Sequence, residues 1–267
     1  PTRYETGVRT RHNEPKAYPT IFTNLCTVLT GDCLSLAHLP DMVTEAHSSP
    51  RGITTLHGEG SQLVTSKILE RIEKCSSEHK DGVFTRLYRY LLREDIYYAA
   101  YQKLYANKGA TTQGIDNDTA DGFSDFYVKE LIQSLKDGTY KANPVRREYI
   151  PKKNGKLRPL GIPSFRDKLL QEVVRMILEA IYEPVFDSHS HGFRPGKSCH
   201  TALRQISSDF TGVVWFIEGD IQGCFDNINH EKLIEILSRK IKDSRFLNII
   251  RQFLKAGYIE NWKYNAT

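Results

Sequence analysis

Several features that would place this sequence in a familiar class are missing from it. No apolar run approaches the roughly 20 residues that a membrane-spanning helix needs, and no signal segment opens the chain. Internal repeats and low-complexity tracts are also lacking. We therefore expect an intracellular protein that has no membrane partner.

Closely spaced cysteine pairs are missing as well. The chain has five cysteines, an odd number, and no two of them form a Cys-x-x-Cys pair. A disulfide framework or a zinc ribbon requires closer, paired spacing. The pattern predicts reduced cysteines in a cytosol-like compartment.

An excess of one charge is small overall, but basic residues cluster in one segment. The net charge is +5, from 37 Lys and Arg against 32 Asp and Glu. Between residues 141 and 158, however, seven residues are basic and only Glu148 is acidic. Such a cluster attracts phosphate backbones, although a solvated charged face has the same composition. A motif is needed to decide between these two interpretations.

Hydrophobic periodicity divides the chain into an irregular start and a helical continuation. Residues 1–60 contain scattered Pro, Gly and Ser that break every candidate period, which predicts mostly loop. Apolar residues then recur at helical spacing in four stretches. These stretches predict helices at residues 63–72, 84–92, 96–105 and 128–135.

The second half of the chain mixes strands with helices. Asn154-Gly155 is a strong signal for a tight turn between two short strands. Ser164 and Asp167 form a capping-box pair that starts a long amphipathic helix. In chain order the expected elements are strands at 147–151 and 156–160, a helix at 164–181, a short helix at 202–206, a buried strand at 213–217, and helices at 233–241 and 246–254. Helices that flank a few strands favour an α+β fold.

Asp220 stands at the carboxyl end of the expected buried strand. A carboxylate fixed by a strand, with backbone carbonyls beside it, suits Mg²⁺, which prefers oxygen ligands. Polymerases join a 3′-hydroxyl to a nucleoside triphosphate through two such ions, and nearby Arg and Lys neutralise the transferring phosphoryl group. Turn capping explains most Asp residues after a strand, so this position alone identifies no activity.

Three longer motifs make the pattern specific. Residues 149–163 (YIPKKNGKLRPLGIP), 190–203 (SHGFRPGKSCHTAL) and 220–228 (DIQGCFDNI) follow one another along the chain. In this order they resemble the fingers hairpin, the next fingers motif and the first catalytic motif of group II intron-encoded reverse transcriptases. The resemblance runs from about Tyr88 to the end. It implies the right-hand fold of that family, with a poorly structured segment at 1–60, a helical N-terminal extension and start of the fingers at 61–140, fingers at 141–210, and the beginning of the palm at 211–267.

The resemblance also implies roles for single residues. Asp220 would be catalytic and, with the Ile221 carbonyl, would hold Mg²⁺, while Phe225 would lie beneath the nucleotide sugar as a steric gate. Lys152 and Arg158 would grip the triphosphate, since the planar Arg fork matches phosphate oxygens. Contacts to nucleic acid would come from Arg146, Arg147, Lys153, Lys156, Arg194 and Lys197. Core packing for Phe225 and a solvated surface for Lys153 and Lys156 are the alternatives.

The implied activity is RNA-directed DNA synthesis, combined with a maturase role in splicing and retrohoming. The implied partners are group II intron RNA, an RNA template with a DNA primer, and a deoxynucleoside triphosphate, in the bacterial cytoplasm or an organellar matrix. The family's second acidic motif, Tyr-x-Asp-Asp, does not occur before Thr267, and the thumb is missing. We therefore expect this chain alone to be inactive and to act with a C-terminal half or a second chain. An RNA-binding protein without chemistry, and a CRISPR-associated or retron-type reverse transcriptase, are the alternatives.

Overall fold

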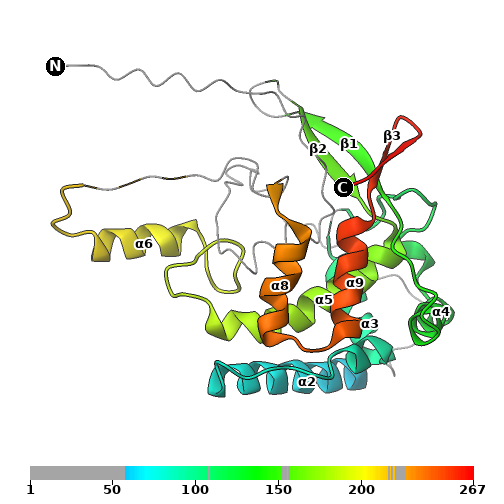
Figure 1. The fold of residues 1–267 in the computed structure, drawn as a ribbon, viewed down its shortest axis with the longest axis horizontal. Helices are drawn as coiled ribbons and strands as arrows, with labels where there is room; N and C mark the ends of the chain where they lie inside the picture. Colours follow the sequence, from blue (N-terminus) through cyan, green and yellow to red (C-terminus); the bar gives the residue numbers. More distant parts are fainter. Residues whose placement is uncertain are drawn as a thin grey trace.

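The computed structural model describes residues 58–107, 109–151, 155, 157–215, 217, 219 and 227–267. Within these residues the predicted α+β fold is confirmed (Figure 1). The helices are α2 (Gly58–Glu78), α3 (Glu94–Tyr105), α4 (Asp125–Lys136), α5 (Phe165–Tyr182), α6 (Cys199–Asp209), α8 (His230–Lys240) and α9 (Ser244–Lys255), with short 3-10 turns η1 (Tyr88–Leu92), η2 (Ala120–Gly122) and η3 (Glu183–Val185). The strands are β1 (Val145–Pro151), β2 (Leu157–Ile162), β3 (Tyr258–Glu260) and β4 (Lys263–Asn265). None of the described helices has the length and apolar character needed to cross a membrane.

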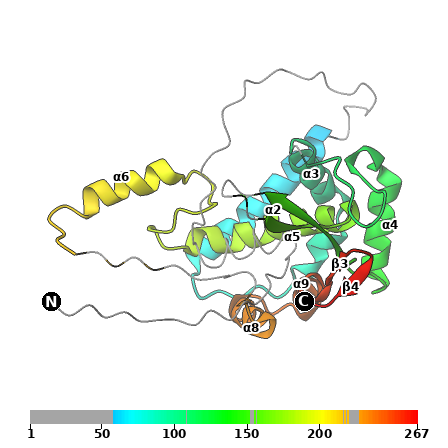
Figure 2. The same ribbon diagram turned by 90° about the horizontal axis from the view of Figure 1, so that it is seen from above.

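Helix α5 runs through the middle of the molecule, with α2, α3 and α9 around it (Figures 1 and 2). Its apolar residues recur three and four apart, and most of the helix is buried. The helix packs against α2 and α3, and one continuous core extends from Ile72 on α2 to Leu254 on α9. Seven of the predicted helices are therefore confirmed, as α2, α3, α4, α5, α6, α8 and α9.

The carboxylate of Asp167 ties the first turn of α5 to the segment that leads into β1. Asp167 is 1% exposed and accepts hydrogen bonds from the Tyr140 hydroxyl (2.5 Å) and the Asn143 backbone N–H (2.8 Å). Burial raises the pKa of Asp167, and the two donors work in the opposite direction. The Ser164 side chain accepts from the Asp167 backbone N–H, as a helix cap should. The predicted capping box is thus half formed, because the Asp167 side chain bonds toward β1 instead.

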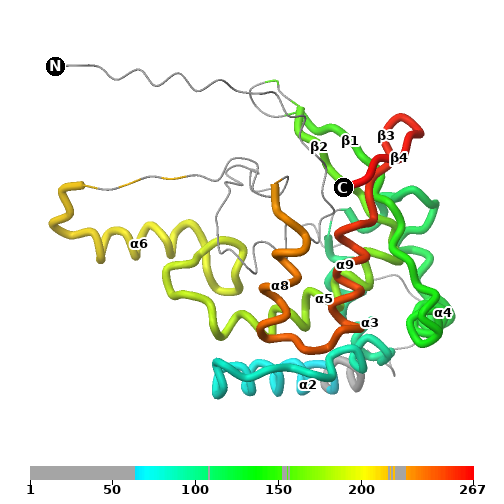
Figure 3. The backbone as a smooth tube through the Cα atoms, in the orientation of Figure 1, coloured from blue at the N-terminus to red at the C-terminus, as the bar shows by residue number. Residues whose placement is uncertain are grey.

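The sheet has the strand order β2-β1-β3-β4. Strands β1 and β2 form the predicted antiparallel hairpin, in a register that runs from Arg146↔Ile162 to Pro151↔Leu157. Strand β3 then joins β1 in parallel, and β4 returns antiparallel to β3. The backbone trace shows this C-terminal hairpin, in red, beside the green strand β1 (Figure 3). The sequence analysis predicted neither β3 nor β4.

The helix predicted at residues 84–92 is wrong for most of its length. Phe84 instead forms a parallel β-bridge with Ile241, and only the 3-10 turn η1 follows. The backbone groups of this segment are satisfied by the connection between α8 and α9. Phe84 N–H donates to the Lys240 carbonyl (2.8 Å), and Tyr88 N–H donates to the Asp243 carboxylate (2.8 Å). These tertiary partners outcompete the local helical pattern.

The buried strand predicted at residues 213–217 is also wrong in the part of this run that the structure describes. Val213, Val214, Trp215 and Ile217 lie outside any strand and are 52%, 83%, 87% and 100% exposed. A β-branched and aromatic run becomes a strand only when it finds a neighbouring strand to pair with. The four described strands pair with one another in the order β2-β1-β3-β4, and the described residues of this run pair with none of them.

Candidate nucleic-acid interface

The β1–β2 hairpin places three of the predicted arginines in three different environments. Arg158 lies on β2 opposite Ile150, and its side chain is exposed. Among the described residues it has neither an ion-pair nor a hydrogen-bond partner. A guanidinium with five free donors on a rigid strand can bind a phosphate group bidentately. Arg158 is the predicted site residue whose geometry best suits an anionic ligand.

Arg146 is already engaged within the protein. Its Nη2 and Nε atoms donate to the Gln113 carbonyl at 2.8 and 3.2 Å, and Nη1 bonds to the Glu148 carboxylate. The side chain is 36% exposed, so part of it still faces solvent. Arg146 therefore joins the loop around Gln113 to the sheet, and it offers less free charge to a ligand than Arg158 does.

Arg147 lies inside the sheet rather than on its surface. Its side chain is 4% exposed, with the guanidinium 3.5 Å from the centre of the Tyr258 ring and 3.6 Å from the Glu260 carboxylate. Its Nε and Nη2 atoms have no hydrogen-bond partner among the described residues. This placement makes Arg147 a packing residue between β1 and β3, which differs from the predicted contact with nucleic acid.

Arg194 and Lys197 lie on the loop that leads from η3 to α6. The Arg194 side chain is 9% exposed and donates to the Glu183 carboxylate (2.9 and 3.0 Å) and to the carbonyls of Asp187 (2.7 Å) and Ser190 (2.9 Å). Its donors thus hold the loop together, which differs from the predicted contact with a template backbone. Lys197 is half-buried as a residue, and its ammonium donates to the Ser188 carbonyl at 3.3 Å.

The remaining predicted site residues lie outside the described residues. These are Lys152, Lys153 and Lys156 at the hairpin turn, and Asp220, Ile221 and Phe225 in the expected catalytic motif. The described part of the chain contains no group of three or more His, Cys, Asp or Glu side chains that could hold a metal ion. Both ring nitrogens of His191 lie within hydrogen-bond distance of a neighbouring side chain, Thr201 at 2.8 Å and Gln205 at 2.6 Å.

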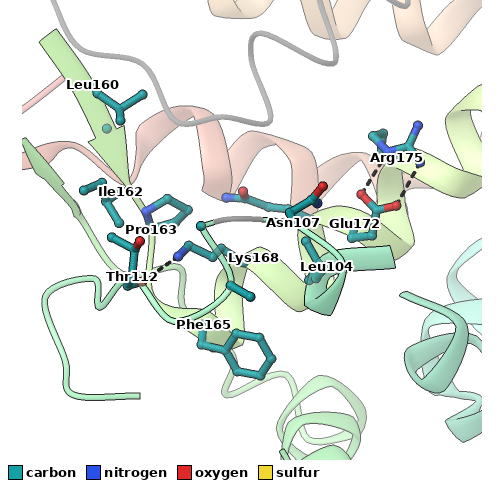
Figure 4. A pocket seen from close by; sticks show the side chains of 14 residues that line it. Leu104, Asn107, Thr112, Leu160, Ile162, Pro163, Phe165, Lys168, Glu172 and Arg175 are labelled. Atoms are coloured by element: carbon teal, nitrogen blue, oxygen red, sulfur yellow. Dashed lines mark hydrogen bonds and ion pairs between the residues drawn. The ribbon is translucent and has the colours of Figure 1, made fainter. Parts of the chain in front are cut away.

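A cavity of about 310 Å³, which the sequence analysis missed, opens beside β2 (Figure 4). Its lining is mostly apolar and includes Leu160, which shares one face of β2 with Arg158 because the two are separated by one residue. At one end the Lys168 ammonium donates to the Thr112 carbonyl (2.7 Å), and burial lowers the pKa of Lys168. The far end is closed by a bidentate ion pair between Glu172 and Arg175.

An apolar cavity of this size can accommodate a flat organic group, and Arg158 lies two residues along β2 from the cavity wall at Leu160. One sequence signal could have indicated it, the Leu-Gly-Ile-Pro segment that ends β2 just before α5. Its other walls come from the end of α3 and from residues 109–112. Those contacts depend on the tertiary fold, so sequence spacing alone could not predict them.

Comparison with known protein families gives an independent line of support. Residues 150–267 match the family model described as reverse transcriptase (RNA-dependent DNA polymerase). The matched region begins inside β1 and includes Arg158, the cavity wall on β2 and the segment around Asp220.

Individual relatives agree with this match. The chain is 65% identical over 204 residues to the group II intron-encoded protein LtrA of Lactococcus lactis subsp. cremoris. This aligned region covers 76% of this chain and 34% of that protein. It is 48% identical over 219 residues to a 91 kDa protein in the cob intron of Schizosaccharomyces pombe, covering 81% and 27% of the two chains. It is 29% identical over 198 residues to nuclear intron maturase 1, mitochondrial, of Arabidopsis thaliana, covering 68% and 28%. The chain therefore spans about a third of the length of these relatives.

Proposed function

Because this chain belongs to the group II intron-encoded reverse transcriptases and maturases, we propose that it is the front part of an enzyme that copies RNA into DNA and assists intron splicing. In this proposal the chain supplies the helical extension, the fingers and the beginning of the palm. The substrates are an RNA template with a DNA primer and a deoxynucleoside triphosphate, and the maturase partner is group II intron RNA. The 65% identity to an intron-encoded protein is the observation that carries the proposal.

The described residues support a phosphate-binding role for the β1–β2 hairpin. Arg158 is exposed and free among them, and a planar guanidinium on a rigid strand suits the paired oxygens of a triphosphate. We place Lys152 beside it as a second cation and Phe225 beneath the sugar. Lys153, Lys156 and Lys197 remain proposed contacts to the nucleic-acid backbone. Arg194 instead holds its own loop in shape.

We assign the chemistry to Asp220, with the Ile221 backbone carbonyl as a second oxygen ligand. Bound Mg²⁺ would supply charge neutralisation at the transferring phosphoryl group, and reverse transcriptases generally require a divalent metal. The protein's own contribution is to position the triphosphate, through Arg158 and Lys152, against the primer hydroxyl. A single carboxylate is too few ligands for two metal ions, so we expect further acidic residues from outside this chain.

The exposed apolar run at 213–217 fits the same proposal. Its described residues are unpaired and largely in solvent, although their side chains are typical of a buried strand. We propose that this run pairs with a strand supplied by the remaining part of the protein, or by a second chain that takes its place. We also place the complete protein in the bacterial cytoplasm or an organellar matrix, where intron RNA is made.

Primer extension by the complete reading frame tests the enzymatic proposal. With Mg²⁺ and an RNA template, the complete protein should extend a DNA primer, and Asp220→Ala should abolish extension while leaving RNA binding intact. A matched control is Asp209→Asn, which changes an exposed carboxylate at the end of α6 and should extend normally. Normal extension by Asp220→Ala would remove the catalytic assignment.

A second candidate function is RNA binding without catalysis. Two observations favour it. The Arabidopsis relative is named a maturase, and Arg158 is an exposed cation that has no partner among the described residues. Complete protein that binds intron RNA tightly, promotes splicing and fails to extend any primer would establish this candidate over the polymerase.

A further inference from the structure

The turn of the β3–β4 hairpin carries a tryptophan that the fold leaves in solvent. Trp262 is 99% exposed, and with Asn261 it forms the two-residue turn between Glu260 and Lys263. The φ angles of Asn261 and Trp262 are both positive, 49° and 64°. Two-residue turns of this kind favour Asn at the first position and Gly at the second. A tryptophan in the second position is therefore unfavourable for the backbone conformation, and the burial of its ring does not compensate, because the ring is exposed.

The hairpin is nevertheless held firmly against β1. Gly257 allows the chain to enter β3 at close range, because a Cβ at this position would lie 2.6 Å from the Asn265 carbonyl oxygen. The Arg147 guanidinium stacks on Tyr258, and the Tyr149 hydroxyl donates to the Glu260 carboxylate. These contacts hold β3 against β1, so the turn that carries Trp262 lies on the same sheet as the β1–β2 hairpin.

Disfavoured backbone conformations persist where function requires them, and the surroundings of Trp262 indicate which function. A protein partner would need a contiguous apolar patch, with charged residues depleted at its centre. The residues beside Trp262 in the turn are polar, namely Glu260, Asn261 and Lys263, and Tyr264 is the one other large aromatic side chain of this hairpin that is exposed. Single-stranded nucleic acid needs only a flat ring to stack on and cations near its phosphates. Lys263 and Arg158, both exposed, supply those cations on the same sheet.

We propose that Trp262 is a stacking contact for an unpaired base of the RNA that this protein binds. The proposal rests on the RNA-binding part of the proposed function and adds to it a specific residue and a preference for single strands. Binding of the phosphate backbone by the β1–β2 hairpin would bring an adjacent base to the β3–β4 turn. The stack is sequence-tolerant, because every base has a π-face.

Replacing Trp262 by glycine separates this role from a structural one. An Asn-Gly pair suits a two-residue turn better than the native Asn-Trp pair, so Trp262→Gly should keep or raise the thermal stability of the hairpin. Its affinity for a 12-nucleotide single-stranded RNA of mixed sequence, measured by fluorescence anisotropy with the 267-residue chain, should fall about 5- to 100-fold. Trp262→Phe should retain most of the affinity. Trp215→Gly, at the other exposed tryptophan, is the matched control and should bind normally.

The same RNA in a fully paired duplex completes the test. Its bases are not available for stacking, so wild type and Trp262→Gly should bind it equally. Equal affinity of the two proteins for the single strand overturns the stacking proposal and leaves the proposed RNA binding in place. An equal loss on single strand and duplex also overturns it, since the ring would then contact something other than a base. If the wild-type chain binds neither RNA, the stacking proposal and the RNA-binding role proposed for this part of the protein are both wrong.

Discussion

Replacing Arg158 with glutamine should remove a phosphate contact without disturbing the fold. The side chain is exposed and has no partner among the described residues, so the free energy of unfolding should change by no more than about 0.5 kcal/mol. In the chain without a bound nucleotide, the exposed Arg158 guanidinium is open to a phosphate of single-stranded RNA, and each phosphate neutralised there contributes about 0.7 to the slope of log K against log salt concentration. For Arg158→Gln we therefore expect this slope to become shallower by about 0.7. RNA binding is measured by fluorescence anisotropy at KCl concentrations from about 50 to about 300 mM, on either side of physiological ionic strength.

Arg147→Gln is the matched comparison, because the same substitution falls on the same hairpin but inside the sheet. The Arg147 side chain is 4% exposed and faces both Tyr258 and the Glu260 carboxylate, which would lose its charged partner. We expect a loss of about 1–3 kcal/mol in the free energy of unfolding and an unchanged salt slope for the folded protein. A slope that changes as much as for Arg158→Gln, with stability intact, would refute the assignment of Arg147 to packing.

Three further predictions concern stability. Tyr140→Phe removes a buried hydrogen bond to Asp167 and should lower the free energy of unfolding in urea by about 1.5–3 kcal/mol. Its control, Tyr98→Phe, removes an exposed hydrogen bond to Asp125 and should lower the same free energy by under about 0.5 kcal/mol. Equal losses would contradict the burial of Asp167. Burial raises the pKa of Asp167, so its contribution to stability is present below its ordinary pKa and is lost as the pH rises through the folded value. The difference in urea midpoint between wild type and Asp167→Asn should follow that titration, and a flat difference would count against it. Gly257→Ala should destabilise the β3–β4 hairpin by about 1 kcal/mol or more, read as faster amide exchange in β3 with α5 unaffected; unchanged exchange would show that the chain can enter β3 another way.

The helices were predictable because their signals are local. The apolar stripe of α5 and its Ser164 cap are spaced by the helical repeat itself, and so are the stripes of α8 and α9. The β1–β2 hairpin was predictable for the same reason, since Asn154-Gly155 lies between two short strand-like segments in the sequence. Where a segment bonds to something far along the chain, the local pattern failed. Phe84 pairs with Ile241, so the segment 84–92 forms no α-helix.

The candidate site was predictable to a smaller extent. The motif that contains Arg158 led to a residue that is exposed and has no partner among the described residues, and its role stays a prediction, because a sequence shows charge and not exposure. The sequence predicted phosphate contacts for Arg147 and Arg194 as well. In the structure, the Arg147 side chain instead contacts Tyr258 and the Arg194 side chain contacts Glu183. Trp262 had no sequence signal at all, since an Asn-Trp pair is atypical of a tight turn.

The parallel pairing of β3 with β1 has a consequence for synthesis of the chain. Tyr149 and its partner Glu260 are 111 residues apart, so the inner edge of β1 stays open until β3 has left the ribosome. During that interval Arg147 has no ring to stack on, and an unpaired strand edge is available to other nascent chains. Once Tyr258 docks, the segment between the two strands, in whose sequence Asp220 lies, is anchored at both ends. The pairing of β3 with β1 therefore sets the distance between the two ends of that segment.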